Sequence, residues 1–511
     1  MKIIIQAGGL GTRMRRLTEC KPKVLVPVDN KPILFHIFDE FVGPDDEFIV
    51  IGDYKFDVLD NYLTTFAKGR RVILIKSTEK GNVAGIRNAI SLVPEGEPIL
   101  LVWSDILLPP NIKQSLQQEC LDDGVLIGTI DSTCSWHFDQ GHLIHEKTDK
   151  SGVAGVYYFG NKSLLNNLPL SGSFTTWLSQ QTFPMKGFSL AGCRDVGTLE
   201  AYYKVESLDN RCRPYNQISI SDDRVVKIGL TEEARVFIKR EIDWYVQAND
   251  YQLTNVPRLL NKAPMTLERI HGSNVFRANL NCEQKSDVLK NICHALSSMH
   301  EYGIQPADVW DLNQEYFVKT IDRLRSVMSS IPFSECREIT INGRICKNVL
   351  QNVGLFRRQV YSTLMHTHFA FYHGDCQLTN TLLSGTDVYF IDPRGYFGKT
   401  KIYGDVRYDW AKLYYSIVGN FDQFNVKNFS LSFSRDSVQY SIGSGGWEFL
   451  ESSMFEMVPK NEGTKKEILL IHAIAWLSLA SHAWEDYDSM CVAFYNGTYL
   501  FNEWMTKYAE L

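Results

Sequence analysis

The sequence lacks the marks of a secreted, membrane-spanning or nucleic-acid-binding protein. Its 11 cysteines are scattered over 511 residues without a Cys-x-x-Cys pair, as expected in a reducing cytosol. No apolar run reaches the roughly 20 residues that span a bilayer, and a buried-strand pattern stands where a signal peptide would begin. Basic residues form no long run and the formal net charge is −6, so we expect no nucleic acid and no membrane as partner. These absences predict a cytoplasmic globular protein.

The chain is too long for one ordinary hydrophobic core, so we expect more than one domain. Its first 205 residues alternate short apolar strands with helical segments, which predicts an α/β domain with a parallel sheet between helices. Ligands of such a sheet bind at the carboxyl ends of its strands. The expected strands are 2–6, 47–52, 71–76 and 98–103, and the expected helices are 31–42, 55–66 and 82–92.

A different pattern begins near residue 212. Three short strands are expected at 218–220, 224–228 and 265–270, with a helix at 231–247 between the second and the third. From about 285 the pattern is mostly helical, apart from the segment 371–395. We therefore predict two domains, at 1–205 and 212–511, the second with a small β-rich lobe before a larger helical lobe.

The most informative segment, residues 7–28, reads AGGLGTRMRRLTECKPKVLVPV and follows a short apolar strand. Glycines let backbone N–H groups approach phosphate oxygens closely, and a nearby arginine and lysine supply positive charge. The segment thus predicts a phosphate-binding loop. Its predicted ligand-binding residues are Gly8, Gly9, Gly11, Thr12, Arg13 and Lys23.

From Gly8 to Ile33 the chain matches GGxGTRxxxLTxxxPKxLxPVxxKPI, and here it resembles the NTP transferase family that makes NDP-sugars and CDP-alcohols. The resemblance implies a Rossmann-like fold in which Arg13 and Lys23 stabilise charge as a nucleotidyl group moves to a phosphomonoester. It also implies that Gly81 and Gly85 contact the nucleotide. Asn82-Val83 replaces the usual Gly-Thr of the family, so the base, whether of CTP, UTP, GTP or dTTP, is left open.

The same resemblance assigns four charged residues. Asp105, after a buried strand, and Asp195, in an Arg-Asp-Val-Gly-Thr segment, are expected to hold Mg²⁺. Glu146 and Lys147 are expected to bind the phosphate of the substrate. The alternatives are a strand-end cap for Asp105, a turn residue for Asp195 and a solvated charged pair for Glu146 and Lys147.

A second motif lies far downstream. Residues 372–380 read YHGDCQLTN, with Asp392 after the next strand, and this layout resembles the aminoglycoside phosphotransferase and choline kinase superfamily. The resemblance implies a two-lobed, protein-kinase-like α+β domain that binds ATP. Asp375 would accept the proton of the substrate hydroxyl, and Asn380 and Asp392 would hold Mg²⁺ on the ATP phosphates.

The remaining expected kinase residues lie on either side of this motif. Lys227, on a short strand, and Glu241, in the next helix, are expected to form the ion pair that grips the ATP phosphates. Asp405 and Asp409 are expected either to orient the catalytic loop or to cap a helix. Aromatic residues of the C-terminal helices are expected in the core, with a cage for a quaternary ammonium as the alternative.

A kinase makes a phosphomonoester and a nucleotidyltransferase consumes one, so the two motifs predict a bifunctional enzyme. The first choice is a sugar 1-kinase joined to a sugar-1-phosphate nucleotidyltransferase that makes precursors of surface polysaccharide. The alternatives are an enzyme that makes a CDP-linked amino alcohol such as choline, and a chain in which one half is inactive and regulatory. The sequence leaves open the small-molecule acceptor, the oligomeric state (a homo-oligomer included) and channelling between the sites.

Overall fold

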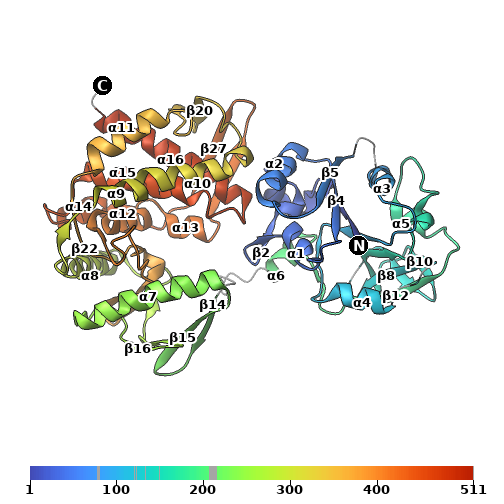
Figure 1. Ribbon diagram of the computed structural model, residues 1–511, viewed down its shortest axis with the longest axis horizontal. Helices are drawn as coiled ribbons and strands as arrows, with labels where there is room; N and C mark the ends of the chain where they lie inside the picture. The colour runs from blue at the N-terminus through green and yellow to red at the C-terminus, as the bar shows by residue number, and fades with distance from the viewer. Residues whose placement is uncertain are drawn as a thin grey trace. The chain divides into compact units, whose positions relative to one another are not determined.

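The computed structural model describes residues 1–77, 81–119, 121, 123–132, 134–148, 150–205 and 216–509 (Figure 1). The chain divides into two compact units. The first comprises Met1–Asp209 with Glu485–Asp488, and the second comprises Asn210–Trp484 with Ser489–Leu511. The boundary expected between 205 and 212 lies outside the described residues. Within those residues no helix has both the length and the apolar character needed to cross a bilayer.

The first unit is built on a mixed sheet with the strand order β10-β9-β11-β6-β1-β4-β5. The four strands expected from the sequence, β1 (Lys2–Gln6), β4 (Glu47–Gly52), β5 (Val72–Lys76) and β6 (Ile99–Trp103), are present and mutually parallel. This part of the sheet is Rossmann-like.

The expectation of a wholly parallel sheet is wrong beyond β6. There β11 (Gly152–Phe159) runs antiparallel both to β6 and to β8 (Val125–Ile130). A parallel pair needs a crossover of a dozen or more residues, usually helical. Instead, the described residues between β8 and β11 form the hairpin of β9 (His137–Asp139) and β10 (His142–Ile144).

Helices cover both faces of the parallel strands, which explains their continuous apolar sequence. Phe48 of β4 packs on Phe38 of α1 (Ile33–Asp39), with ring centroids 4.5 Å apart. Its neighbour Ile49 belongs instead to the core cluster that contains Val83 of α3 (Asn82–Ser91). Successive strand residues point to opposite faces, so α1 and α3 lie on opposite sides of the sheet. Figure 1 shows α2 (Phe56–Phe66) and α3 on either side of β4 and β5.

The helix expected at 31–42 is shorter than predicted. Residues Lys31–Pro32 form β3, which pairs with β2 (Pro27–Val28), and Pro32 keeps an extended backbone with ψ 143°. Helix α1 therefore begins only at Ile33. The other elements of this unit are β7 (Ile106–Leu107), α4 (Ile112–Glu119), α5 (Phe174–Leu178), β12 (Met185–Ser189), β13 (Arg194–Asp195) and α6 (Leu199–Val205).

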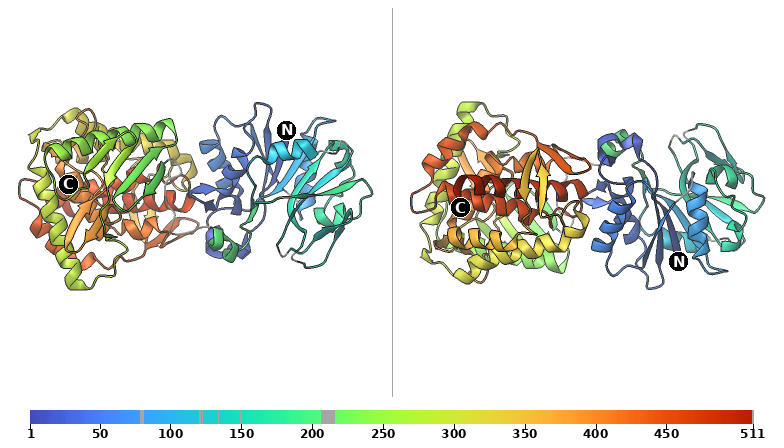
Figure 2. Two further views of the ribbon diagram at one scale, coloured as in Figure 1. Left: turned by 90° about the horizontal axis from the view of Figure 1, so that it is seen from below. Right: turned by 90° about the horizontal axis from the view of Figure 1, so that it is seen from above.

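The second unit opens with an antiparallel sheet in the order β14-β15-β17-β16. The expected strands are present, and the helix expected at 231–247 is α7 (Glu232–Asp250), which packs on β15 and β16. The left view of Figure 2 shows this green helix beside its strands. The strands are β14 (Asn216–Ile220), β15 (Arg224–Gly229), β16 (Leu259–Lys262) and β17 (Met265–Glu268).

The rest of the second unit is mainly helical, and α10 and α12 both pack against α15. Its longer helices are α8 (Cys282–His300), α10 (Lys319–Val327), α11 (Val353–Leu364), α12 (Val406–Ile417), α15 (Lys465–Leu479) and α16 (Tyr487–Tyr508). Its shorter helices are α9 (Val309–Asn313), α13 (Phe421–Asn425) and α14 (Glu451–Met457). Its strands are β18 (Ser273–Asn274), β19 (Gln305–Pro306), β20 (Glu338–Ile341), β21 (Arg344–Lys347), β22 (His368–Phe371), β23 (Thr381–Ser384), β24 (Asp387–Phe390), β25 (Tyr403–Asp405), β26 (Phe429–Phe433) and β27 (Ser437–Ile442).

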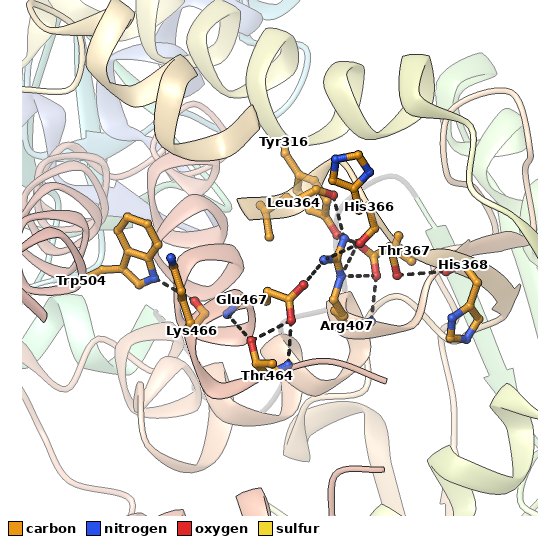
Figure 3. Close-up of polar contacts among 11 residues, drawn as sticks. Tyr316, Leu364, His366, Thr367, His368, Arg407, Thr464, Lys466, Glu467 and Trp504 are labelled. Carbon is orange, nitrogen blue, oxygen red and sulfur yellow. Dashed lines mark hydrogen bonds and ion pairs between the residues drawn. The ribbon is translucent and has the colours of Figure 1, made fainter. Parts of the chain in front are cut away.

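A buried ion network ties the starts of α12 and α15 together (Figure 3). Arg407 is 1% exposed and contacts Asp405 at 2.7 Å and Glu467 at 2.6 Å. Asp405 is the N-cap of α12 and also accepts a hydrogen bond from the Tyr316 hydroxyl at 2.8 Å, while Glu467 forms a capping box with Thr464. Of the two roles expected for Asp405, the structure shows the helix cap.

Candidate active sites

A cavity of about 260 Å³ lies at the carboxyl ends of β1 and β6, where the last residues of these strands, Gln6 and Trp103, line it. After β1 the chain adds β4 and β5 on one side of β1 and then β6 on its other side. Open α/β sheets bind ligands in the crevice at such a switch point. Six of the predicted residues line this cavity: Gly9, Gly11, Thr12, Arg13, Lys23 and Asp105.

The backbone of the loop needs its glycines at two positions. Gly11 has φ 65°, and a Cβ there would lie 2.8 Å from Cγ2 of Thr18. At Gly8 a Cβ would lie 3.0 Å from Cβ of Asp53, and Gly8 does not line the cavity. At Gly9 nothing lies within 4 Å of the Cβ position, so its lack of a side chain leaves space open. The loop can therefore present its backbone N–H groups to a ligand.

Two cations meet one carboxylate at the edge of the cavity. Lys23 Nζ lies 2.9 Å from Oδ2 of Asp105, and Arg13 Nη2 lies 3.8 Å from the same oxygen. The Lys23 side chain is 10% exposed and that of Arg13 is 69% exposed. Lys23 is thus held in place, whereas Arg13 extends into solvent where a phosphate chain can reach it.

The pairing of β13 with β7 brings the second predicted metal ligand beside the first, because Asp195 lies opposite Ile106. A Cβ on Gly197 would lie 2.9 Å from Oδ1 of Asp195 and 3.3 Å from Oδ2 of Asp105. Mg²⁺ is commonly held by one or two carboxylates and completed by phosphate oxygens and water, so this pair fits the ion. Among the described residues, no group of three or more acidic, histidine or cysteine side chains is arranged to hold a metal.

The second glycine segment reaches the cavity through Asn82, which lines it, and not through Gly81 or Gly85. Gly81 has φ 94°, and a Cβ there would lie 2.6 Å from the carbonyl oxygen of Gly172. Gly85 is buried, and a Cβ there would lie 2.5 Å from Ile51. Both glycines therefore permit close packing. The sequence missed Asn82 as a cavity residue, although its place at the start of a helix after a glycine signals ligand contact.

Glu146 and Lys147 are exposed, follow the end of β10, and do not line the cavity. Their predicted role in binding the substrate phosphate has no geometric support here. Gln6, Trp103, Ser104 and Gly197 line the cavity without having been predicted.

In the second unit, Lys227 of β15 lies between two predicted partners. Its Nζ is 2.7 Å from Oε1 and 2.8 Å from Oε2 of Glu241, and 3.0 Å from Oδ1 of Asp392. Burial alone would lower the pKa of Lys227, but the carboxylates of Asp392 and Glu241 outweigh burial, and the pKa is raised. Lys227 therefore stays charged beside the predicted metal ligand, as a lysine that binds phosphate must.

The predicted catalytic loop places Asp375 between two donors. Its Oδ2 accepts from Nδ2 of Asn380 at 2.9 Å, and its Oδ1 pairs with Nζ of Lys412 at 2.9 Å. Lys412, on α12, is a site residue that the sequence missed. Burial opposes its charge, but Asp375 keeps the pKa of Lys412 raised. Asp375 is thus fixed in orientation, with 31% of its side chain exposed to solvent.

Asp409 anchors the backbone of the predicted catalytic loop. It accepts hydrogen bonds from the backbone N–H groups of His373 at 2.7 Å and Gly374 at 2.6 Å. Behind it, His300 bridges Asp409 and Glu462, at 3.1 Å and 2.7 Å. Of the two roles expected for Asp409, the structure shows the one that orients the loop, and His300 and Glu462 are further residues that the sequence missed.

The His300 bridge predicts a stability that depends on pH. Burial alone would lower the pKa of His300, but its hydrogen bonds to Asp409 and Glu462 raise it from 6.5 to about 9. Its stabilisation is therefore fully present below pH 6.5 and lost as the pH rises through 9, on the order of 3 kcal/mol in total. We expect the free energy of unfolding of the unmodified protein to fall over this pH range. It is measured from urea unfolding curves in which pulsed hydrogen exchange on peptides of α8 reports the fraction unfolded.

His300→Gln should remove most of this dependence between pH 6.5 and 9. His294→Gln is the matched control, because His294 lies exposed on the same helix. Identical slopes in the native protein and His300→Gln would show that the bridge does not carry a proton.

Comparison with known proteins bears on the first unit. The sequence profile of the MobA-like NTP transferase domain matches residues 3–142. The UTP–glucose-1-phosphate uridylyltransferase AglF of Haloferax volcanii is 31% identical over 123 residues, which is 23% of this chain and 49% of AglF. Mannose-1-phosphate guanylyltransferase 1 of Arabidopsis thaliana is 31% identical over 125 residues, 23% of this chain and 34% of that protein. The chain thus spans half or less of the length of these two relatives.

Among solved structures, HddC from Yersinia pseudotuberculosis, crystallised with GMP-PN, aligns with 24% identity and a TM-score of 0.35. The alignment covers 40% of this chain and 97% of HddC. The profile match places the similarity to the MobA-like NTP transferase domain in residues 3–142, which contain the four parallel strands of the Rossmann-like sheet.

Proposed function

We propose that the chain is a bifunctional enzyme whose second domain phosphorylates a small hydroxyl compound with ATP. Its first domain then transfers a nucleotidyl group from an NTP to that phosphomonoester and releases pyrophosphate. The proposal assigns the two activities to domains at 1–205 and 212–511. The observation that carries it is the convergence, in each unit, of a lysine with carboxylates suited to Mg²⁺ and phosphate: Lys23 with Asp105, and Lys227 with Glu241 and Asp392.

In the nucleotidyl transfer, an oxygen of the phosphomonoester attacks the α-phosphorus of the NTP, and the bond to the bridging oxygen of pyrophosphate breaks. Lys23 and Arg13, which converge on the cavity, stabilise the negative charge that develops on the α-phosphate and on the leaving group. Asp105 and Asp195 would hold Mg²⁺, which neutralises and aligns the two anionic reactants. The substrate phosphate is itself the nucleophile, so no protein nucleophile is needed.

In the phosphoryl transfer, the acceptor hydroxyl attacks the γ-phosphorus of ATP, its proton passes to Asp375, and the bond to ADP breaks. Asp375 suits this role because Lys412 and Asn380 fix its orientation. Lys227, held by Glu241, would grip the α- and β-phosphates. Asn380 and Asp392 would hold Mg²⁺, which would supply charge neutralisation on the ATP phosphates.

A sugar is the acceptor that we favour. The matched relatives are named for glucose 1-phosphate and mannose 1-phosphate, which are sugars phosphorylated at the anomeric hydroxyl. On this proposal the product is an NDP-sugar of the kind used to build surface polysaccharide.

The test separates the two reactions. Purified protein is incubated with ATP, Mg²⁺ and single compounds from a panel of sugars, sugar acids, sugar phosphates, choline and glycerol, and ADP formation is followed. The phosphorylated product is then supplied with each of CTP, UTP, GTP and dTTP, and pyrophosphate release is followed. ADP without any later pyrophosphate would refute the coupling of the two activities, and pyrophosphate without ADP would refute the kinase half.

A further inference from the structure

Three cationic side chains gather in the second unit around one carboxylate, Glu315. Arg394 Nη2 and Lys319 Nζ both contact Oε2 of Glu315. Arg323 lies one helical turn after Lys319 on α10, and its guanidinium interacts electrostatically with Arg394 and Glu315. Among the described residues, Glu315 is the carboxylate that interacts with all three cations. The cluster of Lys319, Arg323 and Arg394 therefore carries more positive than negative charge.

Two guanidinium groups of this cluster interact with each other, and one of them has a buried donor without a partner among the described residues. Nη1 of Arg394 is buried and makes no hydrogen bond to any residue that the structure describes. Arg323 is half-buried, and its pKa is lowered by burial and by the nearby Arg394. Burial and the charge of Arg394 also lower the pKa of Lys319 to about 7, despite Glu315. Donors left unmade in a buried place are costly unless a ligand accepts from them.

The cluster lies beside the proposed catalytic loop. A Cβ on Gly374 would lie 2.7 Å from Cβ of Arg394, so the arginine side chain starts at the residue before Asp375. Tyr408 provides a second link between the cluster and the proposed catalytic loop. Its ring centroid lies 5.1 Å from Cζ of Arg394, and it precedes Lys412, the partner of Asp375, by one turn of α12. Cβ of Arg394 therefore lies next to the backbone that precedes Asp375, where the acceptor hydroxyl would react.

We propose that the acceptor of the kinase half carries a negatively charged group, a carboxylate or a phosphate, which Arg323, Lys319 and Arg394 bind while Asp375 faces the reacting hydroxyl. The inference rests on the proposed kinase function and names its substrate class. A sugar acid, sugar phosphate or hydroxy acid would place its carboxylate or phosphate where three cations share the single carboxylate of Glu315. Charge-assisted hydrogen bonds from the arginines would then fix the orientation of the acceptor. A quaternary ammonium such as choline would meet like charge in the same place, which disfavours the amino-alcohol alternative.

The first experiment compares acceptors that share a scaffold and differ in charge. ADP formation is measured with D-glucose, D-glucuronate and D-glucose 6-phosphate, with glycerol, D-glycerate and glycerol 3-phosphate, and with choline. We expect ADP formation only with the compounds that carry a carboxylate or a phosphate. Comparison of the carboxylates with the phosphates then shows which anion is preferred. Turnover with choline or only with neutral members would overturn the inference and leave the proposed kinase standing. If fluorescent mant-ATP binds but no anionic member reacts, the inference is also overturned, whereas failure of mant-ATP to bind would overturn the kinase function itself.

The second experiment removes one cation with the anionic acceptor that reacts. Arg323→Ala is expected to raise the KM for that acceptor about 10- to 100-fold while leaving the KM for ATP within about twofold. Arg325→Ala is the matched control, because Arg325 is exposed on the same helix, and it should change neither constant. An unchanged acceptor KM in Arg323→Ala, or equal losses in both variants, would contradict a role of the cluster in binding the acceptor.

Discussion

Asp375→Asn is expected to lower kcat for ATP-dependent phosphorylation by about 10³-fold while pyrophosphate release from a supplied phosphomonoester continues at the native rate. The amide has nearly the shape of the carboxylate but cannot take up the hydroxyl proton. It also loses the charge that pairs with Lys412 at 2.9 Å. The loss should appear in kcat more than in the KM for ATP, because Lys227 and Glu241, which are proposed to grip the nucleotide, remain paired.

Both rates are measured on one preparation, with ADP and pyrophosphate detected separately. Asp387→Asn serves as the control, because Asp387 is an exposed carboxylate on the neighbouring strand β24. Loss of both activities in Asp375→Asn, in a protein that keeps its native unfolding transition, would contradict the model of two separate sites. A kinase rate within tenfold of the native one would remove Asp375 from proton transfer.

The parts that the sequence predicts well are those in which local chemistry dictates structure. Glycines at 8, 9 and 11 with Arg13 and Lys23 follow a strand whose residues Ile3–Ile5 are fully buried, so position at the end of a buried strand can be read from spacing alone. The same holds for the sequence from His373 to Asn380, whose short range brings Asn380 to Asp375 within one turn of backbone. Such local motifs need no knowledge of how distant segments pack.

The residues that the sequence misses come from segments far away in the chain. Lys412 of α12 pairs with Asp375 of the predicted catalytic loop, and His300 of α8 pairs with Asp409 of α12, although the partners lie far apart in the sequence. A lone lysine or histidine in a helix gives no signal of this, since most such residues are solvated or satisfied within the core. Conversely, Glu146 and Lys147 have the right chemistry but do not line the cavity. Residue type predicts which side chains a site needs, and tertiary packing decides which residues of the chain supply them.

Lys23→Ala is expected to lower the rate of nucleotidyl transfer by about 10³-fold and leave ADP formation unchanged, so that the phosphorylated intermediate accumulates when ATP, acceptor and NTP are all present. Lys23 is the less exposed of the two cations at Asp105, and a preorganised charge in a partly closed site stabilises a transition state more than a mobile one does. Arg13→Ala should therefore cost less, by about tenfold or more relative to Lys23→Ala. Lys68→Ala, at an exposed lysine of the same unit, is the control. If Arg13→Ala proved the more damaging of the two, the charge at the α-phosphate would have to come from the mobile arginine, and the ion pair of Lys23 with Asp105 would be a structural contact instead of a catalytic one.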